Sequence, residues 1–307
     1  MAPSSLLTSR AVIGEFYHRL TIAPASWIDR YAMRIQSKQD TETYAWLGQV
    51  PTMREWIGGR LAKDLPEYRY SLKNKDHEAT LEINVKDMKR DMSGQIMVRI
   101  GELAQRALSY PAKLISTLIV NGEATVGYDG QFFFDTDHVD AGSGSQSNDL
   151  TFPAATGTVP TVPEMRDAIM ASIQAIVGLK DDVGEPMNEG ASTFEIMVPV
   201  ALYATALSAV LLPVVDAGVA NIIQAQNEFK ISVVPNVRLT DATKFYTFRT
   251  DGQTKPFIIQ EEEPIQVDAV AEGSELEFKE RKHWYGVLWA GNVGYGFWQH
   301  AALTTFT

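Results

Sequence analysis

The chain has 307 residues, more than a typical domain of roughly 100–150, so it has room for two sub-domains. Its composition, 45% hydrophobic and 21% charged without any Cys, is that of a folded protein that lacks disulfides and thiolate metal sites. The formal net charge of −11 argues against a sequence-specific nucleic-acid-binding protein. Neither a run of ~18 apolar residues, as in a membrane-spanning helix, nor a secretory signal is visible.

Charge is distributed unevenly along the chain. Residues 1–63 carry eight Lys or Arg against five acidic residues, a balance of +3, whereas residues 260–280 carry eight acidic residues against one Lys, a balance of −7. Charge runs of this kind usually face water. The alternative interpretation is that the basic N-terminal half meets the acidic segment of a neighbouring subunit, where complementary charge fixes register more than it adds affinity.

The first ninety residues predict an arm followed by an extended excursion. Residues 1–40 combine short apolar groups with spaced basic residues, which indicates an arm with one or two helical pieces. Residues 41–90 are extended and end in a strand, where Leu81, Ile83 and Val85 alternate with polar residues. Together these segments predict a long two-stranded hairpin, which is only marginally stable in water and needs a neighbour.

A long helix is the clearest periodic signal. Apolar residues recur in one stripe from about 92 to 109, and Asp91 or Ser93 is suited to cap the start. Pro111 breaks or kinks the pattern, which then resumes as far as Asn121.

A flexible connection precedes a second sub-domain. Residues 139–160 are rich in Gly, Ser, Thr and Pro, so residues 91–160 are predicted to hold the long helix and a surface linker. Residues 161–243 then alternate helix and strand, which predicts a small mixed α/β layer. The expected elements are a helix over 162–179 with Met165, Ile169, Ile173 and Ile176 on one face, a strand over 193–199, a helix over 200–212 and a strand over 231–234.

Residues 244–307 are predicted to be mostly strands. The expected strands lie at 245–248, 257–260, 284–289 and 294–298. Glycines beside bulky rings indicate strands that pack closely against a helix. We expect this segment to return to the long helix and to complete the sheet of the first sub-domain.

Aromatic residues in the turn-rich stretch 43–60 are candidates for a contact between subunits. Glycines and Pro51 interrupt any helical period, so this stretch is too turn-rich to bury its own large rings. Exposed rings on a protruding loop favour aggregation unless a partner surface covers them. The predicted intersubunit contacts are the anchors Tyr44, Trp46 and Trp56 and the rim charges Arg54, Glu55 and Arg60.

The segment Asp135-Thr136-Asp137-His138 is the best enzyme-like feature. Its oxygen and nitrogen ligands could seat a divalent cation, either catalytic or structural. A catalytic site needs further ligands and a pocket, and no second cluster has metal-ligand spacing, so a loop held by carboxylate and imidazole hydrogen bonds is the favoured interpretation. No nucleophile elbow or Walker loop occurs, and no catalytic residue, metal site or cofactor is assigned.

Two local motifs carry a resemblance to a known family. Residues 42–56 read ETYAWLGQVPTMREW, and residues 128–138 read YDGQFFFDTDH. In this order and at this separation they resemble the major head subunit, or gpT-like major capsid protein, of Mu-like phages and prophages. The resemblance extends from about residue 40 to the C-terminal strands.

The resemblance implies an α+β fold of the Hong Kong 97-type phage capsid. In that fold the chain divides into an N-terminal arm (1–40), an extended hairpin loop (41–90), a peripheral domain with a spine helix (91–160, completed by return strands from 244–307) and an axial domain (161–243). The implied function is self-assembly, as hexamers and pentamers, into the icosahedral head shell around double-stranded DNA. The subunit would be assembled in the host cytoplasm and reside in the virion.

The implied partners are further copies of the chain together with portal, scaffolding or protease, and decoration proteins, but no membrane. Proximity to packaged DNA would be non-specific, because a net acidic subunit avoids the tight phosphate binding of a strongly basic interior. The basic N-terminal arm is the segment expected to touch DNA or a scaffolding protein. Two alternatives stay open: the shell of a bacterial nanocompartment, and a metal-dependent hydrolase that uses the loop from Asp135 to His138.

Overall fold

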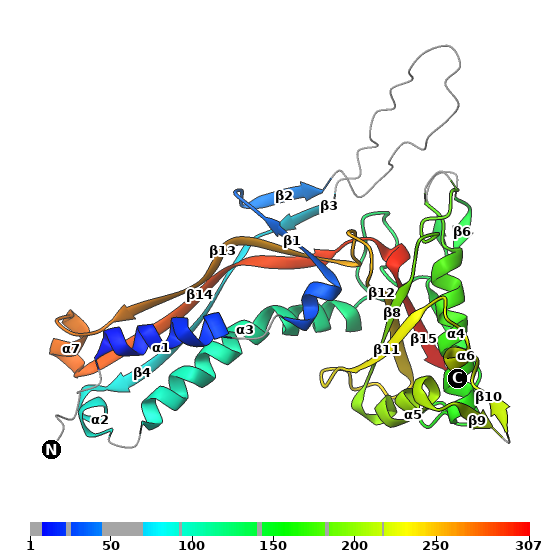
Figure 1. The fold of residues 1–307 in the computed structure, drawn as a ribbon. Helices are drawn as coiled ribbons and strands as arrows, with labels where there is room; N and C mark the ends of the chain where they lie inside the picture. The colour runs from blue at the N-terminus through cyan, green and yellow to red at the C-terminus, as the bar shows by residue number, and fades with distance from the viewer. Residues whose placement is uncertain are drawn as a thin grey trace, which may run out of the picture.

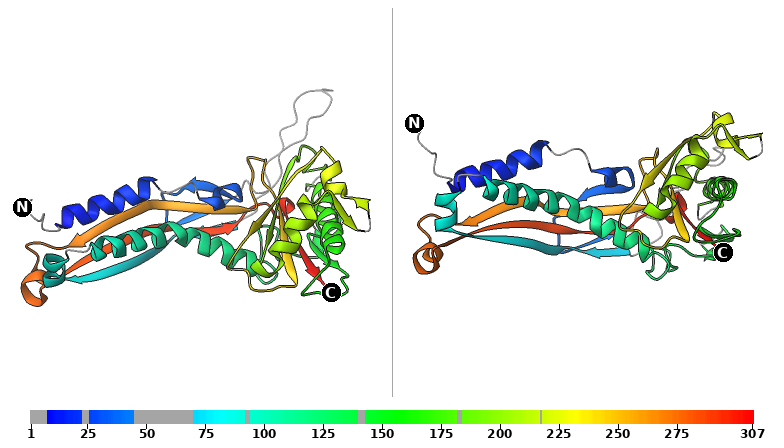
Figure 2. Two further views of the ribbon diagram at one scale, coloured as in Figure 1. Left: turned by 60° about the horizontal axis from the view of Figure 1, so that its bottom comes forward. Right: turned by 90° about the horizontal axis from the view of Figure 1, so that it is seen from below.

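An elongated arm and a thicker end unit make up the fold in the computed structural model (Figure 1). The structure describes residues 8–22, 26–44, 70–91, 94–139, 143–181, 184–216 and 218–307. One long helix, α3 (Gln95–Val120), runs along the arm and reaches the end unit. Two further views show the same elongated shape, with α7 (Glu275–Glu280, orange) at the tip of the arm (Figure 2).

The arm is built on a four-stranded sheet, which we call the arm sheet. Its order is β1 (Ala32–Gln36), β13 (Phe257–Val270), β14 (Lys282–Tyr295) and β4 (Lys75–Asn84). β1 is parallel to β13, and the other two pairings are antiparallel. β13 and β14 have 14 residues each and therefore span about 47 Å, which gives the arm its length.

Helices α3 and α1 (Ser9–Ile22) pack on the arm sheet. Ile100 and Ala104 lie one turn apart on α3 and share a buried cluster with Val12 and Phe16 of α1 and with Tyr285 of β14. The cluster explains the predicted apolar stripe, because residues at i and i+4 occupy the same face of a helix. The short helix α2 (Val85–Arg90) joins β4 to α3.

The long helix is capped as expected and is not broken at Pro111. The Asp91 carboxylate accepts hydrogen bonds from the backbone N of Gln95 (3.1 Å) and Ile96 (2.9 Å). Helix α3 continues through Pro111 to Val120. Pro111 and Ile115 are buried, and packing of this face offsets the one backbone hydrogen bond that proline cannot donate.

The end unit contains a five-stranded sheet, which we call the end sheet. Its order is β11 (Lys230–Pro235), β8 (Thr193–Val198), β12 (Lys244–Arg249), β15 (Ala301–Phe306) and β7 (Asp149–Phe152). Phe194 and Ile196 of β8 belong to a cluster with α4 (Val162–Gly178) and α5 (Val200–Leu211). On the opposite face, Met197 and Phe248 pack with the C-terminal half of α3. Both faces are therefore covered, which explains the nearly continuous apolar runs of these strands.

Helix α4 confirms the sequence prediction most closely. Its start carries a capping box in which the Thr161 side chain accepts from the Glu164 backbone N and the Glu164 carboxylate accepts from the Thr161 backbone N. The expected apolar face, formed by Met165, Ile169, Ile173 and Ile176, is fully buried.

The return segment 244–307 divides between the two sheets. We expected it to complete the sheet of the first sub-domain, and β13 and β14 do so. β12 and β15 instead pair with each other and join β8 and β7 in the end sheet. The prediction for β12 and β15 was wrong for a physical reason. Both strands are buried on their two faces, and the end sheet is covered on both of its faces.

The predicted two-stranded excursion over 41–90 is corrected for its last strand only, because residues 41–44 and 70–73 do pair antiparallel. β4, its last strand, pairs with β14 in the arm sheet and not with the earlier part of the excursion. Ile83 of β4 contributes to the buried cluster under α1 and α3, and this burial favours the arm sheet over an isolated hairpin.

The remaining elements are short. They are η1 (Trp27–Arg30), β2 (Thr41–Tyr44), β3 (Tyr70–Lys73), β5 (His138–Val139), β6 (Ser145–Gln146), β9 (Val214–Asp216), β10 (Val219–Ala220), α6 (Ile222–Ala225) and η3 (Trp298–His300). No helix in the described part of the chain is long and apolar enough to cross a membrane.

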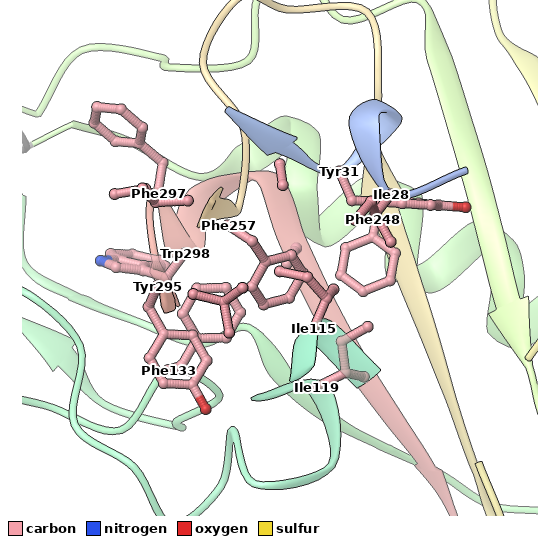
Figure 3. Close-up of a cluster of buried hydrophobic side chains, with 14 of the residues drawn as sticks. Ile28, Tyr31, Ile115, Ile119, Phe133, Phe248, Phe257, Tyr295, Phe297 and Trp298 are labelled. Carbon is pink, nitrogen blue, oxygen red and sulfur yellow. The ribbon is translucent and has the colours of Figure 1, made fainter. Parts of the chain in front are cut away.

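An aromatic cluster joins the arm to the end unit (Figure 3). The Phe133 ring stacks on Tyr295 with centroids 4.6 Å apart and lies 5.3 Å from Phe257. Phe257 in turn meets Phe248 of the end sheet at 5.8 Å. Because these rings come from both sheets and from the segment after α3, they couple the arm and the end unit in one core.

Candidate assembly surfaces

A short two-stranded ribbon forms the base of the predicted contact loop. β2 pairs antiparallel with β3, and Tyr44 lies opposite Tyr70. The chain leaves this base after Tyr44 and returns at Tyr70, and residues 45–69 lie outside the described part of the structure. The base therefore defines where the loop begins and ends.

Gln260 of β13 holds the loop base through a buried hydrogen-bond network. Tyr44 Oη donates to Gln260 Oε1 (2.6 Å), and Gln260 Nε2 donates to Asn74 Oδ1 (2.6 Å) and to the Leu72 carbonyl (3.2 Å). Asn74 Nδ2 donates to Ser37 Oγ (2.9 Å). The side chains are buried, so each polar group needs its partner. Burial raises the pKa of Tyr44, which keeps its hydroxyl protonated as a donor.

The returning strand is seated against a glycine of β14. The Tyr295 backbone N donates to Tyr70 Oη (2.9 Å). A Cβ on Gly294 would lie 2.8 Å from Tyr70 Oη and 3.1 Å from Leu72 Cδ2, which is too close for carbon. The contact of β3 with β14 therefore depends on the absence of a side chain at position 294.

The structure describes one of the six predicted contact residues. Tyr44 is 3% exposed within its own subunit, so the expectation that a second copy must cover its ring is corrected. The reason is that Tyr44 ends β2 at the loop base and packs on the body of the subunit. The other five residues, Trp46, Arg54, Glu55, Trp56 and Arg60, lie outside the described residues, and their intersubunit role stays a prediction.

Part of the acidic segment is paired within the chain. Arg34 of the basic half pairs with Asp29 (2.7 Å) and with Glu261 (3.7 Å). Glu272 Oε1 accepts from the backbone N of Ser9 (2.9 Å), which holds the start of α1 to the arm. The two oppositely charged regions thus meet inside one subunit, and their contact between subunits stays a prediction.

Both ends of the molecule expose large apolar side chains. Phe278 of α7, at the arm tip, is 89% exposed, and Trp284 and Val270 of the adjoining strands are also exposed. The end unit exposes a second set: Val200, Leu211, Leu212, Val214, Ile222 and Val237. Contiguous exposed apolar patches mark interaction surfaces, so these two sets are the candidate assembly surfaces. Sequence reasoning missed them because tertiary packing decides which apolar residues are left uncovered.

His138 is buried at the centre of a polar cluster. Its Nδ1 hydrogen-bonds Asp129 Oδ2 (2.6 Å), and its Nε2 lies 3.1 Å from Asn148 Oδ1. The imidazole stacks on the Trp298 ring with centroids 3.8 Å apart and planes 4° from parallel. Asn148 Nδ2 donates to the Phe133 carbonyl (2.8 Å). The cluster therefore links the loop after α3 to η3 and holds the aromatic core in place.

Asp135 and Asp137 lie beside this cluster. Burial acts to raise the pKa of Asp135, but hydrogen bonds from the Thr136 and Phe132 backbone N and from Asp137 outweigh it and lower that pKa. The hydrogen bond with Asp135, together with its negative charge, raises the pKa of Asp137. These two carboxyl groups therefore interact with each other and with the backbone of their own loop.

The arrangement leaves little for a metal ion to bind. Both nitrogens of His138 and both oxygens of Asp135 are engaged by protein groups. Within the described residues, no group of three His, Asp or Glu side chains is arranged to hold a metal. The hydrogen bonds agree with the favoured interpretation of the motif as a loop held by carboxylate and imidazole contacts.

Comparison with solved structures identifies the class of protein. The subunit in the procapsid of bacteriophage JBD30 is similar, with a TM-score of 0.57 and 25% identity over 99% of this chain and 76% of that chain. The capsid of cyanophage P-SCSP1u has a TM-score of 0.58 and 10% identity, covering 92% and 88% of the two chains. The chain thus has the α+β fold of Hong Kong 97-type phage capsid subunits, as the sequence predicted.

The family model described as Mu-like prophage major head subunit gpT matches residues 7–157 and 223–305, and the chain belongs to this family. The major capsid protein of Escherichia phage Mu is 35% identical over 124 residues, a match that spans 40% of this chain and 40% of that relative. The resemblance inferred from the two sequence motifs is confirmed.

Proposed function

We propose that this chain is the major capsid protein of a Mu-like phage head and that it acts as a structural protein, not as an enzyme. Copies would assemble as hexamers and pentamers into an icosahedral shell that encloses double-stranded DNA. Family membership and the capsid fold support this function. The observation that carries it is the exposure of large apolar side chains at both ends of an otherwise well-packed subunit.

The proposed mechanism is geometric. Obligate assemblies typically bury more than about 2,000 Å² per interface, and an elongated subunit that touches neighbours at its tip, its end unit and its loop supplies such area from separate surfaces. Helix α7, which contains Phe278, lies at the arm tip, at the opposite end from α5 and α6. One subunit can therefore contact several copies at once, as a closed shell requires.

The proposed partners besides other copies are portal, scaffolding or protease, and decoration proteins. Assembly would take place in the host cytoplasm and the mature location would be the virion. The family match favours a phage head over the shell of a nanocompartment. It also favours a structural role over a hydrolase, in agreement with the engaged ligands of His138.

Electron microscopy of the purified chain tests the assembly. We expect closed particles from the unaltered chain and few or none from Phe278→Ser. Glu275→Ser, on the exposed surface of the same helix, is the matched control and should leave particle yield unchanged. A chain that stays monomeric at high concentration would contradict the proposed function.

The loop contacts are tested separately. Trp46→Ala combined with Trp56→Ala should leave a folded subunit that fails to close particles, because interface energy concentrates in buried aromatic anchors. Normal particle yield from this double variant would show that the two tryptophans are not interface anchors. It would not contradict the shell function itself.

A further inference from the structure

One exposed stripe of α3 is predominantly basic. Arg99, Arg106 and Lys113 are spaced seven residues apart, which places them on the same face of the helix and about 10.5 Å from one another along its axis. All three are exposed, and Glu102 is the one acidic residue of α3. In a chain with a net charge of −11, this stripe is a local exception.

The basic stripe continues beyond the end of α3. Arg238, in the loop after β11, lines a hollow of about 260 Å³ together with Lys113. The other residues of the hollow are Ser116, Thr117, Val120 and Asn121. The helix and the loop thus bring Arg106, Lys113 and Arg238 onto one surface, although they are far apart in the sequence.

These three cations are not neutralised within the subunit. Among the described residues, Arg106, Lys113 and Arg238 form no ion pair, whereas Arg99 is paired with Glu102 (3.2 Å). Asp76 and Glu78 line a hollow with Arg106 without pairing to it.

Acidic groups near the end of the stripe are engaged elsewhere. Glu123 pairs with Lys244, and Asp241 Oδ1 accepts from the Thr243 backbone N (2.9 Å) and Oγ1 (2.6 Å). The three unpaired cations are therefore available to an external anion.

We propose that Arg106, Lys113 and Arg238 form a contact for the phosphate backbone of duplex DNA. Duplex DNA carries one negative charge per roughly 1.7 Å of its axis, so cations such as Arg106 and Lys113, about 10.5 Å apart along α3, can each meet a phosphate. The surface offers charges beside Thr117 and Asn121. Its apolar groups are the half-buried Tyr110 ring, which lies under Lys113 Nζ (5.8 Å), and the exposed Val120. Protein interfaces centre on aromatic and apolar groups, whereas phosphate contacts use Lys, Arg and small polar side chains.

The inference rests on the proposed head-shell function, which brings the subunit beside packaged DNA. Three contacts give a weak and non-specific interaction, so this contact is compatible with an acidic subunit that does not bind the genome tightly. The contact would hold the outermost duplex along α3 while still letting DNA slide.

Salt-dependent binding to a 30-base-pair duplex tests the proposal. Three phosphate contacts predict a slope of about −2.7 for log affinity against log salt, which is a loss of about 40-fold between 50 and 200 mM KCl. The triple variant R106Q/K113Q/R238Q should bind weakly with a nearly flat slope. The matched control K86Q/K180Q/K230Q removes the same total charge at other exposed positions, outside the N-terminal arm, and should keep the slope of the unaltered chain.

The possible outcomes separate the two proposals. A triple variant with the unaltered slope, or a control variant that loses as much affinity, would overturn the DNA contact. A triple variant that binds DNA normally but forms no particles would show that the stripe meets an acidic surface of another copy, which also overturns it. DNA binding without closed particles from the unaltered chain would instead contradict the shell function.

Discussion

Replacement of Gln260 by Leu removes the centre of the network that holds the loop base. The substitution leaves Tyr44 Oη, Asn74 Oδ1 and the Leu72 carbonyl without the partners they have now. A hydrogen bond contributes about 1 kcal/mol to stability, so the loss of these three bonds should cost the closed form of the base about 3 kcal/mol. At about 1.4 kcal/mol per factor of ten, the base should open about a hundredfold more often.

Hydrogen exchange monitored by mass spectrometry on the subunit measures this opening. Peptides from β2 and β3 should exchange about a hundredfold faster in Gln260→Leu, whereas peptides from α4, in a different core cluster, should exchange at an unchanged rate. Tyr44→Phe leaves only Gln260 Oε1 without its donor, at about 1 kcal/mol, and should accelerate exchange about fivefold.

The matched control lies on the same strand. Gln266 makes one exposed hydrogen bond, to Glu263 (3.3 Å), so Gln266→Leu should leave exchange in β2 and β3 unchanged. If Gln260→Leu also leaves that exchange unchanged, the network does not hold the base, and the reasoning from buried partners is wrong.

Two further predictions concern stability. Burial lowers the pKa of His300 from 6.5 to about 3, so the unfolded state binds the proton more readily and the unfolding free energy should fall as pH drops from 6.5 toward 3, by up to about 1.4 kcal/mol per pH unit. Measured by urea unfolding across this range, the unfolding free energy should depend less steeply on pH in His300→Asn. An equal pH dependence in the variant and the unaltered chain would show that His300 is not the group responsible. Gly294→Ala forces a Cβ against Tyr70 and should lower the unfolding free energy by about 1–3 kcal/mol. In the control Gly286→Ala the new Cβ would meet Thr80 Oγ1 at an ordinary 3.5 Å, so the unfolding free energy should fall by less. Equal losses of unfolding free energy in the two variants would show that no clash occurs at position 294.

The candidate surfaces were only partly predictable. The aromatic stretch and the family motifs directed attention to the loop, but Tyr44 belongs to the loop base and is covered by its own subunit. The exposure of Phe278 could not be predicted, because an aromatic residue among acidic ones has the same sequence pattern whether it is buried or exposed. The stripe from Arg106 to Arg238 also escaped notice, since its last member comes from a distant loop.

Local patterns were sufficient for the longer helices α3, α4 and α5 and for many strands, but not for the short helices α2, α6 and α7 or for β7, which lies in the segment predicted to be a flexible linker. Helix α4, with its 3.6-residue apolar period, could be predicted directly, because this signal acts between residues a few positions apart. Strand pairing was not accessible in this way, since β12 and β13 follow one another yet belong to different sheets. That choice depends on which helices cover each strand, and the loop around His138 likewise acquires its role from Trp298, far along the chain. Contacts between distant segments are absent from any local pattern, so only the folded chain decides them.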